Sequence, residues 1–115
     1  MSQKRAVPFQ PQQIVCLEYK QTYLYAEVVQ DIRERQMCWV RPLCLKTPDH
    51  LTDLREGADI VWYSDAFRPA LDTEVLPLLT ELPTKAEPVQ TPGTVLNQFM
   101  RQVWQQQHVK TPPHD

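Results

Sequence analysis

The sequence contains three cysteines and three histidines, the residue types that most often bind metal ions or act as nucleophiles. Cys38 and Cys44 lie in the apolar stretch RQMCWVRPLCL, where both fall on the same side of a straight strand, roughly 20 Å apart. Neither a zinc ion nor a disulfide bridges such a distance, and no CxxC or HxxxH spacing occurs. Cys16 could meet one of these two cysteines but not both. We therefore expect three reduced, buried cysteines and no metal site, with a regulatory thiol as the alternative.

Enzyme motifs are also missing from the sequence. It has no glycine-rich phosphate loop and no activated serine or cysteine motif, and its histidines fall in polar connections or tails. Asp49, His50 and Asp53 form an acid–base cluster, but they lie in a polar loop. We therefore expect a non-enzymatic protein that uses no cofactor.

The charge balance argues against non-specific binding to polyanions. The formal net charge is −2 and the pI is about 5.9. Residues 1–46 hold seven Lys/Arg and four Asp/Glu, whereas residues 49–87 hold three and nine, which predicts one weakly basic and one acidic face. The N-terminus has no apolar run typical of a signal peptide, and no apolar run approaches the roughly 20 residues that span a bilayer. We expect a cytoplasmic protein without membrane insertion.

Strands are the first elements expected to position these residues. Apolar and polar residues alternate most clearly over residues 23–32, where Leu24, Ala26, Val28 and Ile32 fall on one side and Tyr23, Tyr25, Glu27 and Asp31 on the other. Only Val29 is out of place. Similar stretches predict strands at residues 13–19, 37–45 and 60–64, and the first three form a meander. Pro42 lacks an N–H for the ladder, so it predicts a sheet edge or a bulge.

A helix is expected after the last strand. Asp72 or Thr73 can cap it, and Pro77 either begins or bends it. Its predicted buried stripe comprises Leu71, Val75, Leu78, Leu79 and Leu82. The fold class is therefore α+β: a small, bent antiparallel sheet or SH3-like barrel of four to five strands, with a following helix. This β-rich domain spans residues 13–82, after a flexible arm at residues 1–12.

The composition changes after residue 82. Residues 83–93 are rich in proline and read as a linker, residues 94–108 have the periodicity of an amphipathic helix, and residues 109–115 form a tail. The apolar stripe of the helix comprises Val95, Leu96, Phe99, Met100, Val103 and Trp104. A helix of this length is marginal alone in water. It must therefore pack on its own sheet, or in a groove on a protein partner or a sister copy.

Aromatic and arginine side chains suggest where another protein could bind. Both sides of the strand at residues 37–45 are apolar, so it is either covered on both faces by the chain's own helices or leaves an apolar patch exposed. Tryptophan beside arginine is typical of interface hot spots. The residues expected to contact a partner are Trp39, Arg41, Trp62, Phe67, Phe99, Met100, Val103 and Trp104. The sequence thus favours a protein-interaction or accessory module, acting through a partner or as a homo-oligomer.

The alternative function is binding of single-stranded RNA. Tyr23 and Tyr25 project from one side of their strand, and Arg33 and Arg35 follow in the sequence. Small barrels hold single strands by stacking bases on aromatic side chains beside arginines. The acidic half of the chain would repel a phosphate backbone, so this hypothesis comes second.

Three phrases, QMCWVRPLCL, LREGADIVW and FRPALDTEVLPLL, resemble the body of a group of small conserved cyanobacterial proteins of unassigned function. The resemblance covers residues 13–82 and excludes the arm, linker and tail. It implies a cytosolic protein of a photosynthetic bacterium, with an accessory or assembly role beside a larger complex. It carries no catalytic residue to this chain.

Overall fold

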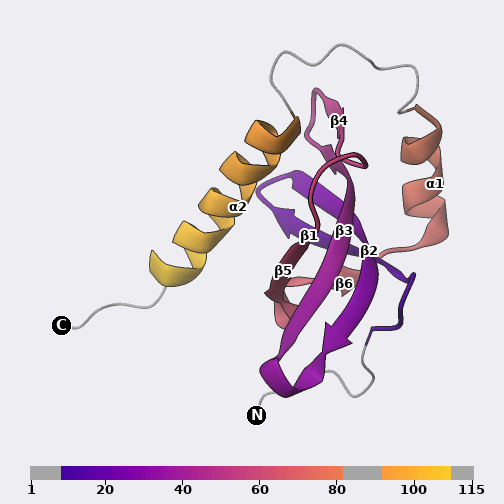
Figure 1. Cartoon of the computed structure of the whole chain (residues 1–115). Helices are drawn as coiled ribbons and strands as arrows, with labels where there is room; N and C mark the ends of the chain where they lie inside the picture. Colours follow the sequence, from indigo (N-terminus) through magenta and orange to yellow (C-terminus); the bar gives the residue numbers. More distant parts are fainter. Residues whose placement is uncertain (1–8, 82–91, 110–115) are drawn as a thin grey trace.

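The computed structural model describes residues 9–81 and 92–109 (Figure 1). Its strands are β1 (Ile14–Tyr19), β2 (Thr22–Ile32), β3 (Met37–Lys46), β4 (Leu51–Asp53), β5 (Ile60–Tyr63) and β6 (Arg68–Pro69). Two short 3₁₀ helices, η1 (Arg33–Arg35) and η2 (Ser64–Ala66), follow β2 and β5. The α-helices are α1 (Asp72–Glu81) and α2 (Pro92–Val109).

The strands form one bent, open antiparallel sheet in the order β4-β3-β2-β1-β6. β3 is long enough to pair with two strands on the same side: residues 37–40 pair with β5 and residues 44–46 pair with β4. The predicted α+β class with a small bent antiparallel sheet is confirmed. The sheet has six strands where four to five were expected, because β4 and β6 are only three and two residues long.

Two β-bulges interrupt the pairing of β2 with β3. The register passes from Val28 opposite Val40 to Gln30 opposite Trp39, which leaves Val29 without a partner on β3, and a second shift leaves Leu43 without a partner on β2. An extra residue reverses the side to which the following residues point. The first bulge accounts for the misplaced Val29 in the sequence pattern. The second lies next to Pro42, as expected for a proline within a paired strand.

The bulges overturn two predictions about which side chains share a face. Cys38 belongs to the cluster around Leu24, whereas Cys44 belongs to the cluster around Tyr25, so the prediction that Cys38 and Cys44 point to the same side is wrong. Asp31 lies opposite Cys38 in the ladder and therefore shares the Leu24 side, where it accepts a hydrogen bond from the Ser64 hydroxyl at 3.3 Å. A pattern of strict alternation had placed it on the other side.

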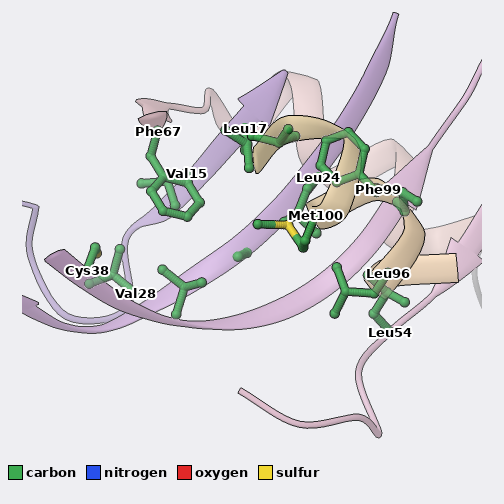
Figure 2. Close-up of a cluster of buried hydrophobic side chains, with 14 of the residues drawn as sticks. Val15, Leu17, Leu24, Val28, Cys38, Leu54, Phe67, Leu96, Phe99 and Met100 are labelled. Atoms are coloured by element: carbon green, nitrogen blue, oxygen red, sulfur yellow. The ribbon is translucent and has the colours of Figure 1, made fainter. Parts of the chain in front are cut away.

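Each face of the sheet is covered by a helix, α1 on one side and α2 on the other (Figure 1). The α2 face holds the larger core (Figure 2), composed of Phe9, Val15, Leu17, Leu24, Ala26, Val28, Cys38, Val40, Leu45, Leu54, Phe67, Leu96, Phe99, Met100 and Val103. The α1 face holds a smaller core of Cys16, Tyr25, Cys44 and Val75, with Leu78 and Leu79 packed at its edge. The sheet is therefore the middle layer of three.

Helix α2 occupies the position that the periodicity predicted, beginning two residues earlier and ending one residue later. Four residues of its predicted stripe are buried against the sheet, namely Leu96, Phe99, Met100 and Val103. Phe99 also meets Tyr19 of β1 edge to face, with ring centroids 6.4 Å apart. Of the two options for this helix, the structure shows packing on its own sheet.

Helix α1 begins at Asp72, and its first turn is closed by Glu74, whose Oε1 accepts the Leu71 N–H at 3.2 Å. This is half of a capping box. Val75 is buried, whereas Leu71 is exposed although it was predicted to belong to the buried stripe. Leu82, most of the predicted linker and most of the tail lie outside the described residues, as does the arm up to residue 8. At the end of that arm, the buried Phe9 joins the larger core, and its N–H donates to Asp31 Oδ2 at 2.8 Å.

The turn between β1 and β2 is built without glycine. Tyr19 pairs with Thr22, and the two residues between them, Lys20 and Gln21, have φ angles of 48° and 66°. Two consecutive positive φ values are what a type I′ hairpin turn requires, and Asn-Gly is its preferred sequence. The hairpin thus holds two ordinary side chains in the left-handed region.

The helices within residues 9–81 and 92–109 do not combine the length and apolar character that a membrane span requires.

Candidate protein-contact site

Strand β5 lies at an edge of the sheet and carries apolar side chains on both of its sides. Its pairing with β3 sets Trp62 opposite Cys38 and Val61 opposite Trp39. Ile60 and Trp62 therefore pack against the core beneath α2, while Val61 points to the opposite side; the Tyr63 ring lies at the edge of the strand, where it meets Trp104 of α2. Val61 is 47% exposed and Tyr63 is 40% exposed. These are high values for large apolar side chains in a strand.

Three aromatic rings meet where β5 approaches α2. The Trp62 and Trp104 rings are edge to face with centroids 6.1 Å apart, and the Tyr63 and Trp104 rings stack at 6.5 Å. Trp62 and Tyr63 also meet edge to face at 5.7 Å. Trp104 remains 42% exposed. We call Val61, Trp62, Tyr63 and Trp104 the β5–α2 patch.

The Trp62 indole lies on the buried side of this patch, against the larger core. Its Nε1 is buried, and no acceptor for it lies among residues 9–81 and 92–109. A buried donor without a partner costs about 1–3 kcal/mol. Within the part of the chain that the structure describes, the ring is therefore held by packing against its neighbours and not by a hydrogen bond.

Trp39 and Arg41 border the patch on β3. Trp39 Nε1 donates to Asp59 Oδ2 at 3.0 Å, and Arg41 Nε donates to Asp59 Oδ1 at 3.3 Å. Asp59 stands just before β5, so its carboxylate ties that strand to β3. Because Trp39 lies opposite Val61 in the ladder, its half-buried ring and the exposed Arg41 share the side of Val61.

Four residues predicted to contact a partner belong instead to the chain's own core. Phe67 follows η2 and is only 5% exposed, and Phe99, Met100 and Val103 lie between α2 and the sheet. The remaining four lie around β5 but on two sides of the sheet. Trp39 and Arg41 share the side of Val61, whereas Trp62 packs on the α2 side, where its ring meets Trp104. Sequence reasoning missed Val61 and Tyr63, although the uncharged run IVWY was the available signal.

The residues predicted to bind RNA do not come together. Tyr25 is 4% exposed, and its hydroxyl donates to Glu74 Oε2 at 2.7 Å beneath α1. Tyr23 stacks on it with centroids 6.3 Å apart. Arg33 and Arg35 are exposed in η1, at the other end of β2 and roughly 30 Å away along the strand. The face that would stack a base on Tyr25 is covered.

An ion pair secures α1 over the smaller core. Arg68 Nη2 donates to Glu74 Oε2 at 2.8 Å, and this contact lowers the pKa of Glu74 to about 2, with the Tyr25 hydroxyl acting in the same direction. The pKa of Tyr25 is raised, first by burial and then by its hydrogen bond to Glu74. Tyr25 is thus kept neutral and Glu74 charged.

The three cysteines are buried, as predicted, and none of the three forms a disulfide. Burial raises the pKa of Cys16 and of Cys44 to about 12, which keeps both thiols protonated at neutral pH. In the part of the chain that the structure describes, no group of three His, Cys, Asp or Glu side chains is placed to hold a metal ion. Asp49 and His50 are exposed, and Asp53 forms an ion pair with Arg55 at 3.0 Å.

Comparison with known proteins found no match to this chain among protein-family models, curated proteins or solved structures. The fold and the β5–α2 patch are therefore the basis of the function proposed for this chain.

Proposed function

We propose that this chain is a non-enzymatic protein-interaction module, an accessory or assembly factor of a larger complex, whose contact surface is the β5–α2 patch with Trp39 and Arg41 beside it. The observation that carries the proposal is the partly exposed cluster of Trp62, Tyr63 and Trp104 at an edge strand. Tryptophan, tyrosine and arginine are the side chains that most often dominate binding energy at interfaces.

The distribution of apolar side chains supports this proposal. The two helices cover most of the sheet, yet Val61, Tyr63 and Trp104 remain exposed, and the Tyr63 and Trp104 rings stack on each other. Single exposed apolar residues are ordinary, whereas a contiguous group more often marks an interaction site. Among the described residues, the other large exposed apolar side chains are Leu71 and Leu76, just before α1 and within it.

We also interpret the sheet as a relative of the SH3-like barrels. The support is the connection from β5 through η2 to β6, which pairs with β1 and so brings the last strand beside the first. The resemblance of residues 13–82 to small cyanobacterial proteins further leads us to propose a cytoplasmic protein of a photosynthetic bacterium.

The competing RNA-binding hypothesis has less support, because the Tyr25 ring is buried and lies far along β2 from Arg33 and Arg35. RNA binding through arginines would weaken steeply as salt is raised.

Affinity capture from a lysate of the source organism tests the proposed function. The bait is the full chain, compared with Val61→Glu in the patch and with Leu76→Glu on α1, which places the same charge at another exposed apolar position. We expect proteins captured by the wild type and by Leu76→Glu to be lost with Val61→Glu, because a buried charge at an interface is costly. The three baits should melt at similar temperatures.

Equal capture by the two variants contradicts the proposal. A parallel arm treats the lysate with ribonuclease and repeats the capture at two salt concentrations. Loss of the captured proteins in that arm supports the RNA hypothesis instead.

A further inference from the structure

Helix α1 covers the face of the sheet opposite α2, and it is attached there by few interactions (Figure 1). Among its described residues only Val75 is buried, whereas α2 buries four. Within residues 72–80, the hydrogen bonds and ion pairs to the sheet are those of the Glu74 side chain. Pro77 removes one backbone hydrogen bond inside this ten-residue helix, which is too short to be stable alone in water. α1 therefore depends on the sheet to remain helical but is held to it weakly.

The chain is fixed to the sheet as far as Ala70. The Ala70 N–H donates to the Ile14 carbonyl at 3.0 Å, which continues the pairing of β6 with β1. Beyond that point the first backbone hydrogen bonds are internal to the helix. The Leu71 carbonyl accepts from the N–H groups of Glu74 and Val75 at 2.9 and 3.1 Å. A hinge between Ala70 and Leu71 thus allows α1 to leave the sheet without breaking any strand pairing.

Beneath α1 the sheet carries a row of polar and titratable side chains. Cross-strand pairing sets five of them side by side from β6 to β4, in the order Arg68, Cys16, Tyr25, Cys44 and Asp53. Residues paired in this way project to the same side of a sheet. Both cysteines are fully buried, and Val75 of α1 belongs to the cluster that encloses them. The helix thus covers two thiols that lie among charged side chains.

We propose that α1 is a strap that opens independently of the rest of the fold, and that its opening makes Cys16 and Cys44 sites of reversible mixed-disulfide formation, with Cys16 the faster. A group attached to either sulfur occupies the space of Val75, so it holds the strap open until it is reduced off. α1 is then a redox-sensitive switch. This inference does not depend on the β5–α2 patch or on the function proposed for it.

The reaction joins a thiolate to a low-molecular-weight disulfide, RSSR. The cysteine sulfur attacks one sulfur of RSSR, the S–S bond breaks, and the other half leaves as RS⁻, so no further oxidant is needed. A second thiol reverses the step. In the closed state, burial raises the pKa of Cys16 and of Cys44 to about 12, so almost no thiolate is present. Opening removes this burial and returns each pKa toward its ordinary value of 9.0.

The charged neighbours of Cys16 favour its thiolate once the strap is open. Arg68 stands opposite it and lowers its pKa, but in the closed state Glu74 binds that guanidinium and acts in the opposite direction. Opening takes Glu74 away. Glu18, 3.9 Å from Arg68, also raises the pKa, but it is half exposed and belongs to β1, so its effect is the same in both states. The Tyr25 hydroxyl lowers the pKa.

The neighbours of Cys44 have the opposite effect. Asp53 stands opposite it on β4 and raises its pKa, whereas Arg55, which lowers it, is bonded to Asp53. None of these groups moves with α1. Cys44 therefore keeps an unfavourable carboxylate after opening, and Cys16 should react first.

Cys16 and Cys44 are placed to react separately and not with each other. Strand β2 lies between them, because Tyr25 pairs with both. Neighbouring strands are about 4.8 Å apart, so the two Cα atoms are roughly 10 Å apart, beyond the limit of about 7 Å for a disulfide. Each cysteine therefore takes up its own RS group as long as the sheet stays intact.

Site-resolved alkylation of the unmodified full chain tests the opening. The folded protein is treated with iodoacetamide at neutral pH, and peptide mass spectrometry follows each cysteine. Cys38 is equally buried but lies in the larger core, so it serves as an internal control. We expect Cys16 and Cys44 to react at least about tenfold faster than Cys38. Low urea should accelerate Cys38 steeply and the other two little, because local opening exposes little surface.

Glu74→Gln loosens the attachment of the strap. We expect it to speed the alkylation of Cys16 and Cys44 by about fivefold. Glu34→Gln, the same change at an exposed position in η1, should leave both rates unchanged.

Incubation with glutathione disulfide tests the modification. We expect one glutathione on Cys16, then a second on Cys44, and none on Cys38. Hydrogen exchange of the α1 amides should become faster in the adduct, while the amides of β2 and α2 keep their protection.

Several results would overturn the inference. Equal rates at all three cysteines would show that only global unfolding exposes the smaller core. An internal disulfide between Cys16 and Cys44 would require the sheet itself to separate. Unchanged rates in Glu74→Gln, or an adduct with protected α1 amides, contradict the strap, and faster reaction at Cys44 contradicts the role given to Arg68.

Discussion

Glu74 connects three elements around the smaller core. One of its carboxylate oxygens accepts from Tyr25 on β2 and from Arg68 on β6, and the other accepts from the Leu71 N–H at the start of α1. A single ionised side chain thus links two strands to a helix. The strength of this link must depend on pH.

The direction of that dependence follows from the pKa of Glu74. Arg68 lowers it to about 2 in the folded protein, against an ordinary value of 4.5. A group whose folded pKa is depressed contributes stability that is fully present above its unfolded pKa. This contribution is lost as the pH falls from about 4.5 through about 2.

Glu74→Gln should therefore lower the free energy of unfolding at pH 7 by about 1 kcal/mol, a value reduced by the solvent exposure of Arg68. The difference from wild type should shrink in acid, because the wild-type carboxylate is then protonated. Urea unfolding at several pH values measures this. Glu34→Gln, which removes an exposed charge in η1, is the control and should change little. Identical acid dependence in wild type and Glu74→Gln would contradict the role given to this carboxylate.

At the residue scale, the side-chain types predicted which residues are buried better than they predicted which residues form an exposed contact surface. Phe67 was expected at a contact surface, but it follows η2 and lies in the core. Tyr63 was not considered, although it proved exposed. The side chains that a short edge strand exposes depend on the strand with which it pairs. The four residues of β5 carry no pattern that identifies this neighbouring strand.

At the element scale, the β1–β2 turn shows how a chain with only two glycines forms a tight hairpin. Lys20 and Gln21 both adopt positive φ, which costs an ordinary residue roughly 1–2 kcal/mol. The cross-strand packing of Leu17 with Leu24 on the buried face of this hairpin offsets that cost.

Gln21→Gly should raise the free energy of unfolding by about 1 kcal/mol, because glycine adopts positive φ without strain. Thermal unfolding followed by circular dichroism measures the change. Gln30→Gly provides the opposite control, since it places glycine within β2 and should destabilise the protein by about 0.5–1 kcal/mol. A loss of stability in both variants would show that the turn is not strained.

The long elements were predictable and the short ones were not. β1, β2, β3 and β5 were predicted close to their observed bounds, because each carries its own alternation or apolar run. β4 and β6 are too short for any period to appear. The bulges at Val29 and Leu43 reverse side-chain direction only through pairing with the neighbouring strand, so the cysteine placement could not follow from parity alone.

At the scale of the whole molecule, the three layers make α2 part of the fold, not an appendage. Burying each of Leu96, Phe99, Met100 and Val103 contributes about 1.5–3 kcal/mol. Their sum is comparable to the entire net stability of a small domain, which is about 5–15 kcal/mol. The amphipathic stripe alone could not decide between the sheet and a partner, because both offer an apolar surface.

Deletion of residues 92–115 should therefore abolish the sharp thermal transition and expose the larger core to a hydrophobic dye. Deletion of residues 110–115 alone should leave the transition in place, because it spares α2. Circular dichroism and dye fluorescence measure both effects. A sharp transition near the full-length melting temperature after the longer deletion would mean that the sheet and α1 are stable without this helix.

The contact of Trp62 with Trp104 also provides an intrinsic optical signal. Two indoles with ring centroids 6.1 Å apart, one on the sheet and one on the last helix, are close enough for their electronic transitions to interact. Their near-ultraviolet dichroism and emission therefore depend on whether the helix lies in place. Because Tyr63 stacks on the same indole, a molecule that binds there would perturb this spectrum without any attached label.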